Sequence, residues 1–182
     1  MSDESRLSLV LERGSEDVHE PEFVSDVPLV SFEAFIARYR VFGWVRLDAD
    51  RLTDLLNAHS ELRLVNVMVE HLGDGDTFSA DEAIVRRDEL VAVRASGPRG
   101  DAARWRNTEP HAVLVEAGPF RIGGHVHSLP GVDPAARIRD GEPMIPLTEG
   151  WIEHRSAGGR QRRRVGTIII NRELAARIEP VE

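Results

Sequence analysis

Apolar and polar residues alternate through most of the chain from residue 29 onward, which predicts strands rather than long helices. Residues 32–47, "FEAFIARYRVFGWVRL", are rich in aromatic and β-branched side chains, and their second half alternates. This pattern indicates one long strand, or two strands joined at a bend. Alternation returns in "ELRLVNVMVEHL", residues 61–72, where Leu62 and Leu64 are expected to point inward.

Short helices and turns are predicted between these strands. "DADRLTDLLNAH" has leucines at helical spacing and Asp48 or Asp50 available as the N-cap, and it allows two or three helical turns at most. "GDGDTFSADE" is typical of a turn, and the next strand, "AIVRRDELVAVRA", is expected to be divided by a tight turn at "RRDE". The polar, Gly-, Pro- and Arg-bearing segment that follows predicts a linker over residues 96–110.

The same order of patterns begins again after the linker. "HAVLVEAGPFRIGGHVHSLPG" alternates around a Gly-Pro interruption, and "VDPAARIRD" places Pro134 where the first turn of a helix accepts it. Two extended segments, "PMIPLTEGWIEH" and "VGTIIINRELAARIEPV", close the chain. Between them, "RSAGGRQRRR" predicts a flexible basic loop.

The two halves of the chain match each other at a separation that drifts from 81 to 85 positions. A drift in one direction is what a duplication followed by a few insertions leaves, so we expect an internal duplication of a small module. Gly43 and Gly124 match in mid-strand, which indicates a sharp bend as in a small barrel, or a surface bulge. The other matches pair Tyr39, Arg40, Val41, Val45, Leu62, Leu64, Val69, Glu70, His71, Val85, Arg87 and Val93 with Phe120, Arg121, Ile122, Val126, Ile145, Leu147, Ile152, Glu153, His154, Ile170, Arg172 and Ile178.

These patterns predict a mainly β fold. Two pseudo-symmetric copies of a strand–short helix–strand–strand module are expected to pack as one barrel-like or sandwich body, because neither copy alone has much core. The predicted segments are an acidic, flexible N-terminal tail over 1–28, the first module over 29–95, the linker over 96–110 and the second module over 111–182.

Composition excludes several classes of protein. The chain of 182 residues is 41% hydrophobic, so it can bury a core, and without cysteine it has no disulfide, catalytic thiol or cysteine-based zinc site. No segment approaches the ~18 apolar residues of a membrane helix, and the first residues lack the basic patch and apolar core of a secretory signal. We therefore expect a cytoplasmic protein without a membrane partner. The net charge of −8 argues weakly against nucleic-acid binding over the whole surface.

"YRVFG" at residues 39–43, followed by "LTDLLN" at 52–57, resembles a pattern of uncharacterised bacterial proteins that carry one or two such β-rich units. This resemblance covers residues 32–95 and, less closely, 111–181, and it brings no established activity. The closing segments "VRRDELVAV" and "INRELAARI" are also similar to the last strands of Sm-like (Hfq-type) RNA-binding barrels. Those barrels begin with a helix and lack one after their first strand, so this similarity implies a related fold only.

Two histidines form a candidate metal site. His125 and His127 in "GHVHS" lie two residues apart, so in a strand both imidazoles project from one face. Glu153 and His154 would complete the site if the next strand lies alongside. The matched positions of the first half carry no histidine, so exposed or hydrogen-bonded histidines are the alternative.

Catalytic motifs are missing from the sequence. The pairs Glu70-His71 and Glu153-His154 recur at matched strand ends, but adjacent strand residues point to opposite faces and do not converge as an acid and a base. The sequence contains no serine elbow, phosphate loop or zinc-protease motif. We therefore favour a protein that is not an enzyme, with no catalytic residue and no cofactor.

Two clusters of arginine are candidates for nucleic-acid binding. One lies in the linker around Trp105 and the other in "RSAGGRQRRR", and basic loops with an aromatic residue can follow a phosphate backbone. They can equally dock the acidic tail or keep a hairpin tip solvated. The candidate residues are Arg99, Arg104, Arg106, Arg160, Arg162, Arg163 and Arg164.

Three hypotheses for function follow. The first is a non-enzymatic binding or assembly module that acts through protein–protein contacts, with its own copies or with another protein. The second is Sm-like nucleic-acid binding through the arginine-rich loops. The third is a metal-dependent activity at His125 and His127.

Overall fold

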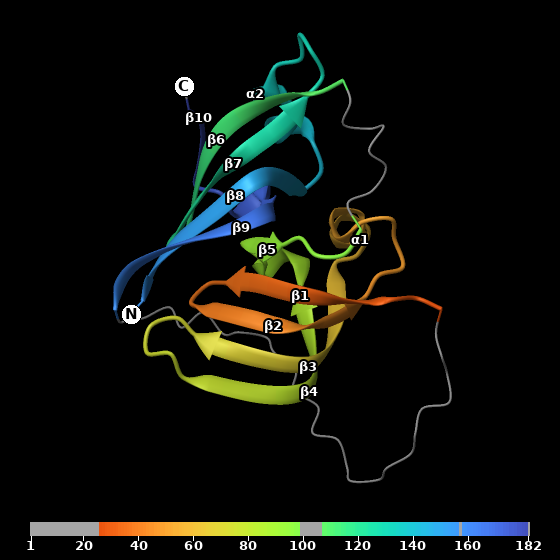
Figure 1. The fold of residues 1–182 in the computed structure, drawn as a ribbon, viewed down its shortest axis with the longest axis vertical. Helices are drawn as coiled ribbons and strands as arrows, with labels where there is room; N and C mark the ends of the chain where they lie inside the picture. Colours follow the sequence, from red (N-terminus) through yellow and green to blue (C-terminus); the bar gives the residue numbers. More distant parts are fainter. Residues whose placement is uncertain (1–25, 99–106, 157, 182) are drawn as a thin grey trace.

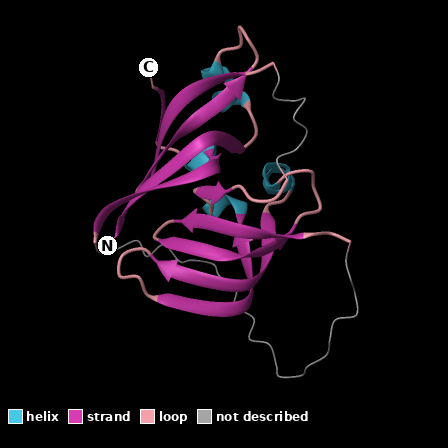
Figure 2. Ribbon diagram, in the orientation of Figure 1, coloured by secondary structure: helices cyan, strands magenta, loops and turns pink. Residues whose placement is uncertain are grey.

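One open sheet of antiparallel strands forms the framework of the protein, in a computed structural model that describes residues 26–98, 107–156 and 158–181. Within these residues, ten strands pair in the order β10-β6-β7-β8-β9-β5-β1-β2-β3-β4 (Figure 1). Strands dominate, and only short helices lie between them (Figure 2). The mainly β class is confirmed, whereas the described sheet keeps two free edges, β10 and β4, and is not a closed barrel. Most of the predicted tail over 1–28 lies outside the described residues.

Each half of the chain supplies one continuous part of the sheet. The first half consists of β1 (Leu29–Ile36), β2 (Tyr39–Arg46), α1 (Leu52–Ala58), β3 (Glu61–His71), β4 (Thr77–Arg86), the 3-10 turn η1 (Arg87–Glu89) and β5 (Ala92–Arg94). The second half consists of β6 (Glu109–Ala117), β7 (Phe120–Ser128), α2 (Pro134–Asp140), β8 (Met144–Ser156), β9 (Gly159–Asn171), the 3-10 turn η3 (Arg172–Leu174) and β10 (Arg177–Pro180).

Hairpins resolve the ambiguities left by the alternating pattern. The segment predicted as one strand or two forms β1 and β2, joined at a turn where Ala37 has a φ of 46°. The predicted tight turn at "RRDE" is confirmed as η1. The prediction of a flexible basic loop is wrong: Arg155 belongs to β8 and the other arginines to β9, and the two strands pair as far as Ser156 and Gly159. Long arginine stems suit a strand, because alternation directs successive guanidinium groups to opposite faces.

The two helices are short and differ at their first turns. α1 begins after Arg51, and neither predicted aspartate caps it; the Arg51 side chain pairs with Asp54 inside the first turn at 2.5 Å. α2 starts at Pro134 as predicted, and the carboxylate of Asp133 caps it by accepting a hydrogen bond from a backbone N–H. In the described residues, no helix is long and apolar enough to cross a membrane.

The two halves have the same order of elements and the same order of strands in the sheet. The second and third strands of each half shift register at Gly43 in one half and at Gly124 in the other. Just beyond, Asn66 and Glu149 both have a φ of 51°. Each shift inserts a bulge, which bends the strand and changes which residues of the third strand face the core.

At the centre of the sheet, neighbouring residues of one strand are buried in different cores, because they point to opposite faces. Val93 and Ile169 belong to the core of the first half, whereas their strand neighbours Ala92 and Ile170 belong to the core of the second half. On β1, Phe35 likewise joins the second core while its neighbours join the first. The last residues of β9, the first two of β5 and most of β1 are therefore buried on both faces, and the two cores share them.

Candidate functional site

A buried carboxylate gathers guanidinium groups from both halves of the chain. Glu33 lies on β1, and its side chain is only 8% exposed. One of its oxygens accepts hydrogen bonds from Arg40 Nη2 and Nε at 2.7 and 2.9 Å, and from Arg163 Nη1 at 2.8 Å. Its other oxygen accepts a bond from Arg94 at 3.3 Å, and Arg40 reaches a second carboxylate, Glu70, at 3.3 Å. Because Arg163 lies on β9, this cluster joins the two halves.

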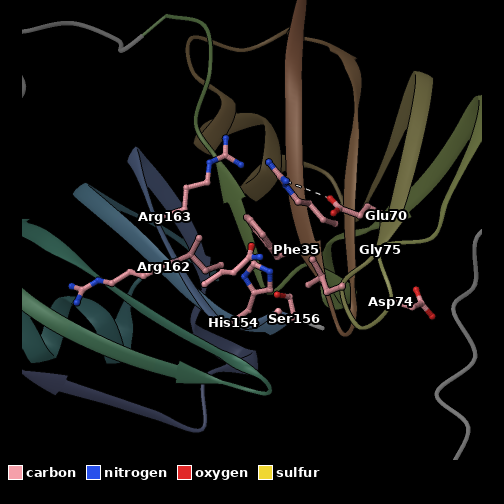
Figure 3. Close-up of a pocket in the computed structure, with 13 residues that line it drawn as sticks. Phe35, Glu70, Asp74, Gly75, His154, Ser156, Arg162 and Arg163 are labelled. Carbon is pink, nitrogen blue, oxygen red and sulfur yellow. Dashed lines mark hydrogen bonds and ion pairs between the residues drawn. The ribbon is translucent and has the colours of Figure 1, made fainter.

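Beside this cluster lies a cavity of about 280 Å³, between the β3–β4 loop and the β8–β9 hairpin (Figure 3). Arg40 and Glu70 line it from the first half, and His154, Gln161 and Arg163 line it from the second. Figure 3 shows Arg162 and Arg163 extending in different directions, as adjacent residues of a strand do. The cavity therefore combines a polar wall from each half with an apolar floor, formed by Phe35, Leu72 and Ile152.

His154 sits on the floor of this cavity among aromatic rings. Its ring centre lies 6.3 Å from that of Phe35 and 6.2 Å from that of Phe120. Burial lowers the pKa of His154, the Arg40 charge lowers it further, and Glu70 partly opposes them, so the imidazole is neutral at pH 7. Its Nδ1 atom is buried and has no hydrogen-bond partner in the described part of the chain.

The β3–β4 loop forms the rim of the cavity and is held by Asp74. Its carboxylate accepts a hydrogen bond from the backbone N–H of Asp76 at 3.0 Å and lies 2.7 Å from His71 Nδ1. The backbone bond and then the histidine lower the pKa of Asp74. This carboxylate is therefore occupied with the loop itself.

The opposite face of the β8–β9 hairpin carries a guanidinium stacked on an indole. Arg162 Cζ lies 3.6 Å from the centre of the Trp151 ring. The ring occupies the space above Gly123, where an added Cβ would meet it at 2.4 Å. Arg164 is exposed on the same face, and neither it nor Arg162 has an acidic partner within the residues that the structure describes.

The candidate nucleic-acid residues are divided between these faces. Arg163 faces the cavity, whereas Arg160, Arg162 and Arg164 alternate with it along β9, and of these three only Arg162 also borders the cavity. Arg160 pairs with Glu153 at 3.6 Å. The linker candidates Arg99, Arg104 and Arg106 lie outside the described residues.

The candidate metal ligands lie on β7 and β8. His127 Nε2 is 2.8 Å from a threonine hydroxyl, and His125 Nδ1 is 3.4 Å from a carboxylate oxygen of Glu149. Glu153 pairs with residue 121 of β7, so it lies four residues, roughly 13 Å, along the strand from His125. His154 faces the cavity. The described residues contain no group of three or more His, Asp or Glu side chains that could hold a metal, and the metal site stays a prediction.

No family model, curated protein or solved structure matches the chain. The resemblance to Sm-like strands and to bacterial β-rich units therefore stays a prediction. A fold alone would not establish function in any case, because function depends on the residues of particular sites.

The two halves join edge to edge through β5 and β9. Val93 lies opposite Ile169 at the centre of this junction. On either side, the N–H of Ala95 donates to the carbonyl of Thr167 at 2.9 Å, and the N–H of Asn171 donates to the carbonyl of Val91 at 3.0 Å. A strand of only three residues thus connects the two parts of the sheet.

Side chains of the second half complete the core of the first. Met144 and Ile169 are 1% and 0% exposed and belong to the first core. The side-chain amide of Asn57, at the end of α1, holds Met144 by bonding to its backbone N–H and carbonyl, both at 3.0 Å. The matching position of the second half remains open as a groove of about 600 Å³ beside α2 and β10, lined by Val113, Ile138 and Ile178 among others.

The sequence-based predictions missed the Glu33 cluster. Four of the five residues in "FEAFI", 32–36, are apolar, and all five are buried. A single carboxylate inside such a run requires cationic partners, because an unpaired buried charge is very costly. The charge of Glu33 within this apolar run was the one signal in the sequence that could have indicated the cluster. The identity of its partner Arg163, 130 positions away, depends on the junction between β5 and β9.

Proposed function

We propose that the protein is a non-enzymatic assembly module that associates end to end with further copies of itself through the free edges of its sheet. The observation that supports this proposal is the β5–β9 junction, because it joins two halves with the same strand order in tandem. β4 is the counterpart of β9, and β10 is the counterpart of β5. The two free edges thus correspond to the two strands that already pair inside the chain.

The proposal rests on an internal duplication, which the shared element order, matched bulges and sequence offsets support. At an offset of 85, Ile169 corresponds to Ile84 and Val93 to Ile178. Repeating the internal junction between two molecules would place Ile178 of one copy opposite Ile84 of the next. The edges lie at opposite ends of the molecule (Figure 1), so the contact is heterologous and adds copies in a ring or a filament.

Burial at the two ends fits this arrangement. Ile169 is fully buried at the internal junction, whereas its counterpart Ile84 on the free edge is 40% exposed. The groove beside α2 and β10 is open, whereas the matching position in the first half is filled by Met144 and Ile169. A second copy that brings its Ile84 into this groove would bury apolar surface at both ends, which favours association.

Pro180 weakens the proposed contact relative to the internal one. It corresponds to Ala95, whose N–H bonds across the internal junction, and proline has no N–H to donate. An intermolecular copy of the junction therefore lacks one ladder hydrogen bond. Proline on an edge strand also limits uncontrolled pairing, so we expect reversible, concentration-dependent association.

Sedimentation equilibrium of the full chain over a wide concentration range tests this proposal. The wild-type mass should rise with concentration, and Ile84→Arg should remain a monomer. Met68→Arg is the matched control, because Met68 is also 40% exposed but lies on β3, away from the free edge. A wild-type chain that stays monomeric throughout would refute the proposal, as would equal loss of association in both variants.

We propose single-stranded nucleic-acid binding on the outward face of β8 and β9 as a second candidate function. The stacked pair of Arg162 and Trp151 beside the exposed Arg164 supports it, because aromatic and guanidinium planes stack with bases while free cations contact phosphates. Fluorescence anisotropy with a short RNA should show salt-dependent binding that is lost in Arg162→Gln/Arg164→Gln. Arg63→Gln, which removes a cation paired with Glu82, is the control. Absence of binding at low salt would exclude this function.

A further inference from the structure

The cavity between the two halves has more hydrogen-bond donors than acceptors. Arg163 has five N–H groups, and in the described structure one of them bonds to Glu33. The amide of Gln161 lines the same cavity without a protein partner among the described residues, and it adds two N–H donors against one carbonyl acceptor. His154 Nδ1 is unpaired as well, and in the neutral ring it donates or accepts according to the tautomer. The carboxylates nearby already accept from arginines or from the rim loop. A ligand that suits this lining must supply acceptor atoms.

The charges at the cavity also favour a negative ligand. Among the residues that line it, Arg40, Arg162 and Arg163 carry three positive charges, against two negative charges on Glu70 and Asp74. Arginine stays protonated at any physiological pH, so the excess of one positive charge persists. The side chain of Arg40 is largely shielded from water. In such surroundings an uncompensated charge interacts more strongly with a ligand than it would at an open surface.

The volume and the floor of the cavity limit the size of the ligand. About 280 Å³ lies just below the range for sites that bind drug-sized molecules, roughly 300–1,000 Å³. Phe35 and Ile152 form an apolar surface opposite the donors. The cavity therefore suits one charged group with a short apolar part.

We propose that this cavity binds a small oxyanion, a carboxylate or phosphate group, held by the guanidinium of Arg163 and the amide of Gln161. Arg40 contributes charge from the first half, and His154 borders the anion from the floor. Both halves then contact one ligand, so binding stabilises the interface at which β8 and β9 pack against β1 and β2. None of the residues that line the cavity belongs to β4 or β10, so the site does not depend on self-association.

Isothermal titration of the full chain with inorganic phosphate, and separately with a short-chain carboxylate, tests the site against sodium chloride of equal ionic strength. Arg163→Gln should weaken binding about tenfold or more, because it removes charge-assisted hydrogen bonds. Arg164→Gln is the matched control: it removes the neighbouring arginine of the same strand, which faces outward, and should change affinity less than about twofold.

The outcomes separate the sources of the anion. Binding of phosphate alone identifies a phosphorylated ligand, and binding of the carboxylate alone identifies an organic acid. Gln161→Leu, at an exposed position outside the Glu33 cluster, provides a second variant that should weaken binding while leaving the melting temperature unchanged. No binding above the chloride control, or equal loss in the Arg163 and Arg164 variants, would overturn the proposal.

Discussion

Replacement of Glu33 by Gln should destabilise the protein by about 3 kcal/mol. The ion pair between Glu33 and Arg40 has two short hydrogen bonds, and the side chains of Glu33 and Arg40 are 8% and 21% exposed. Breaking a buried ion pair on one side costs about 3–5 kcal/mol, but Gln keeps one acceptor oxygen, which reduces this loss. Arg94 and Arg163 are 48% and 43% exposed, so each of their pairs adds only about 0–1 kcal/mol.

Urea unfolding followed by far-UV circular dichroism measures this loss, and for a chain of this length the melting temperature should fall by about 6–12 °C. A double-mutant cycle between Glu33→Gln and Arg40→Gln should give a coupling energy of about 2 kcal/mol or more, against about 1 kcal/mol for Glu33→Gln with Arg163→Gln. Arg63→Gln is the control, because it breaks an exposed pair and should cost less than about 1 kcal/mol. If Glu33→Gln is as mild as this control, the cluster does not hold the halves together.

Three further changes test other parts of the structure. The stability of the wild type should fall as pH decreases below 6.5, because the folded state disfavours a protonated His154 while the unfolded chain binds that proton; urea unfolding across pH should show this dependence reduced in His154→Gln. Gly123→Ala should cost about 1–3 kcal/mol and shift the fluorescence of Trp151, whereas Gly158→Ala, with open space around it, should be neutral in the same assays. Asn57→Ala removes the hydrogen bonds to the first residue of β8 and should lower the melting temperature measured by calorimetry, through a loss of about 1–3 kcal/mol; an unchanged temperature would show that this contact contributes nothing.

Local patterns in the sequence predicted most of the strands, because alternation and turn residues act over a few positions. The tight turn at "RRDE" and the strands around it follow from such signals. The segment "RSAGGRQRRR" shows no alternation of apolar and polar residues, because arginine occupies both faces of β9 there and both faces are therefore polar. There the inward positions are recognisable only once Ile152 and His154 are known to lie opposite Arg163 and Gln161.

The arrangement of strands and the charged cavity depend on contacts that are distant in sequence. Nothing near Val93 indicates that β5 pairs with β9, since the edges of all strands present the same backbone groups. The cavity forms where the β8–β9 hairpin packs on the face of β1 and β2 that carries Glu33, Phe35 and Arg40. This packing depends on the pairing of β5 with β9. The sequence contains Glu33 as a single charge within the apolar run "FEAFI", but nothing in it indicates that Arg163 compensates this charge.

The shared central strands have a consequence for synthesis of the chain. When the ribosome has completed β5 at residue 94, the first core still lacks Met144 and Ile169, which are made later. At roughly 5–20 residues per second, about 4–15 s pass before β9 is finished. After β5 has left the ribosome, its outer edge stays unpaired on the nascent chain for an interval of this length, until β9 follows. Neighbouring ribosomes on one messenger produce β9 strands of identical sequence, so exchange of second halves between chains made together is a misassembly route built into this fold.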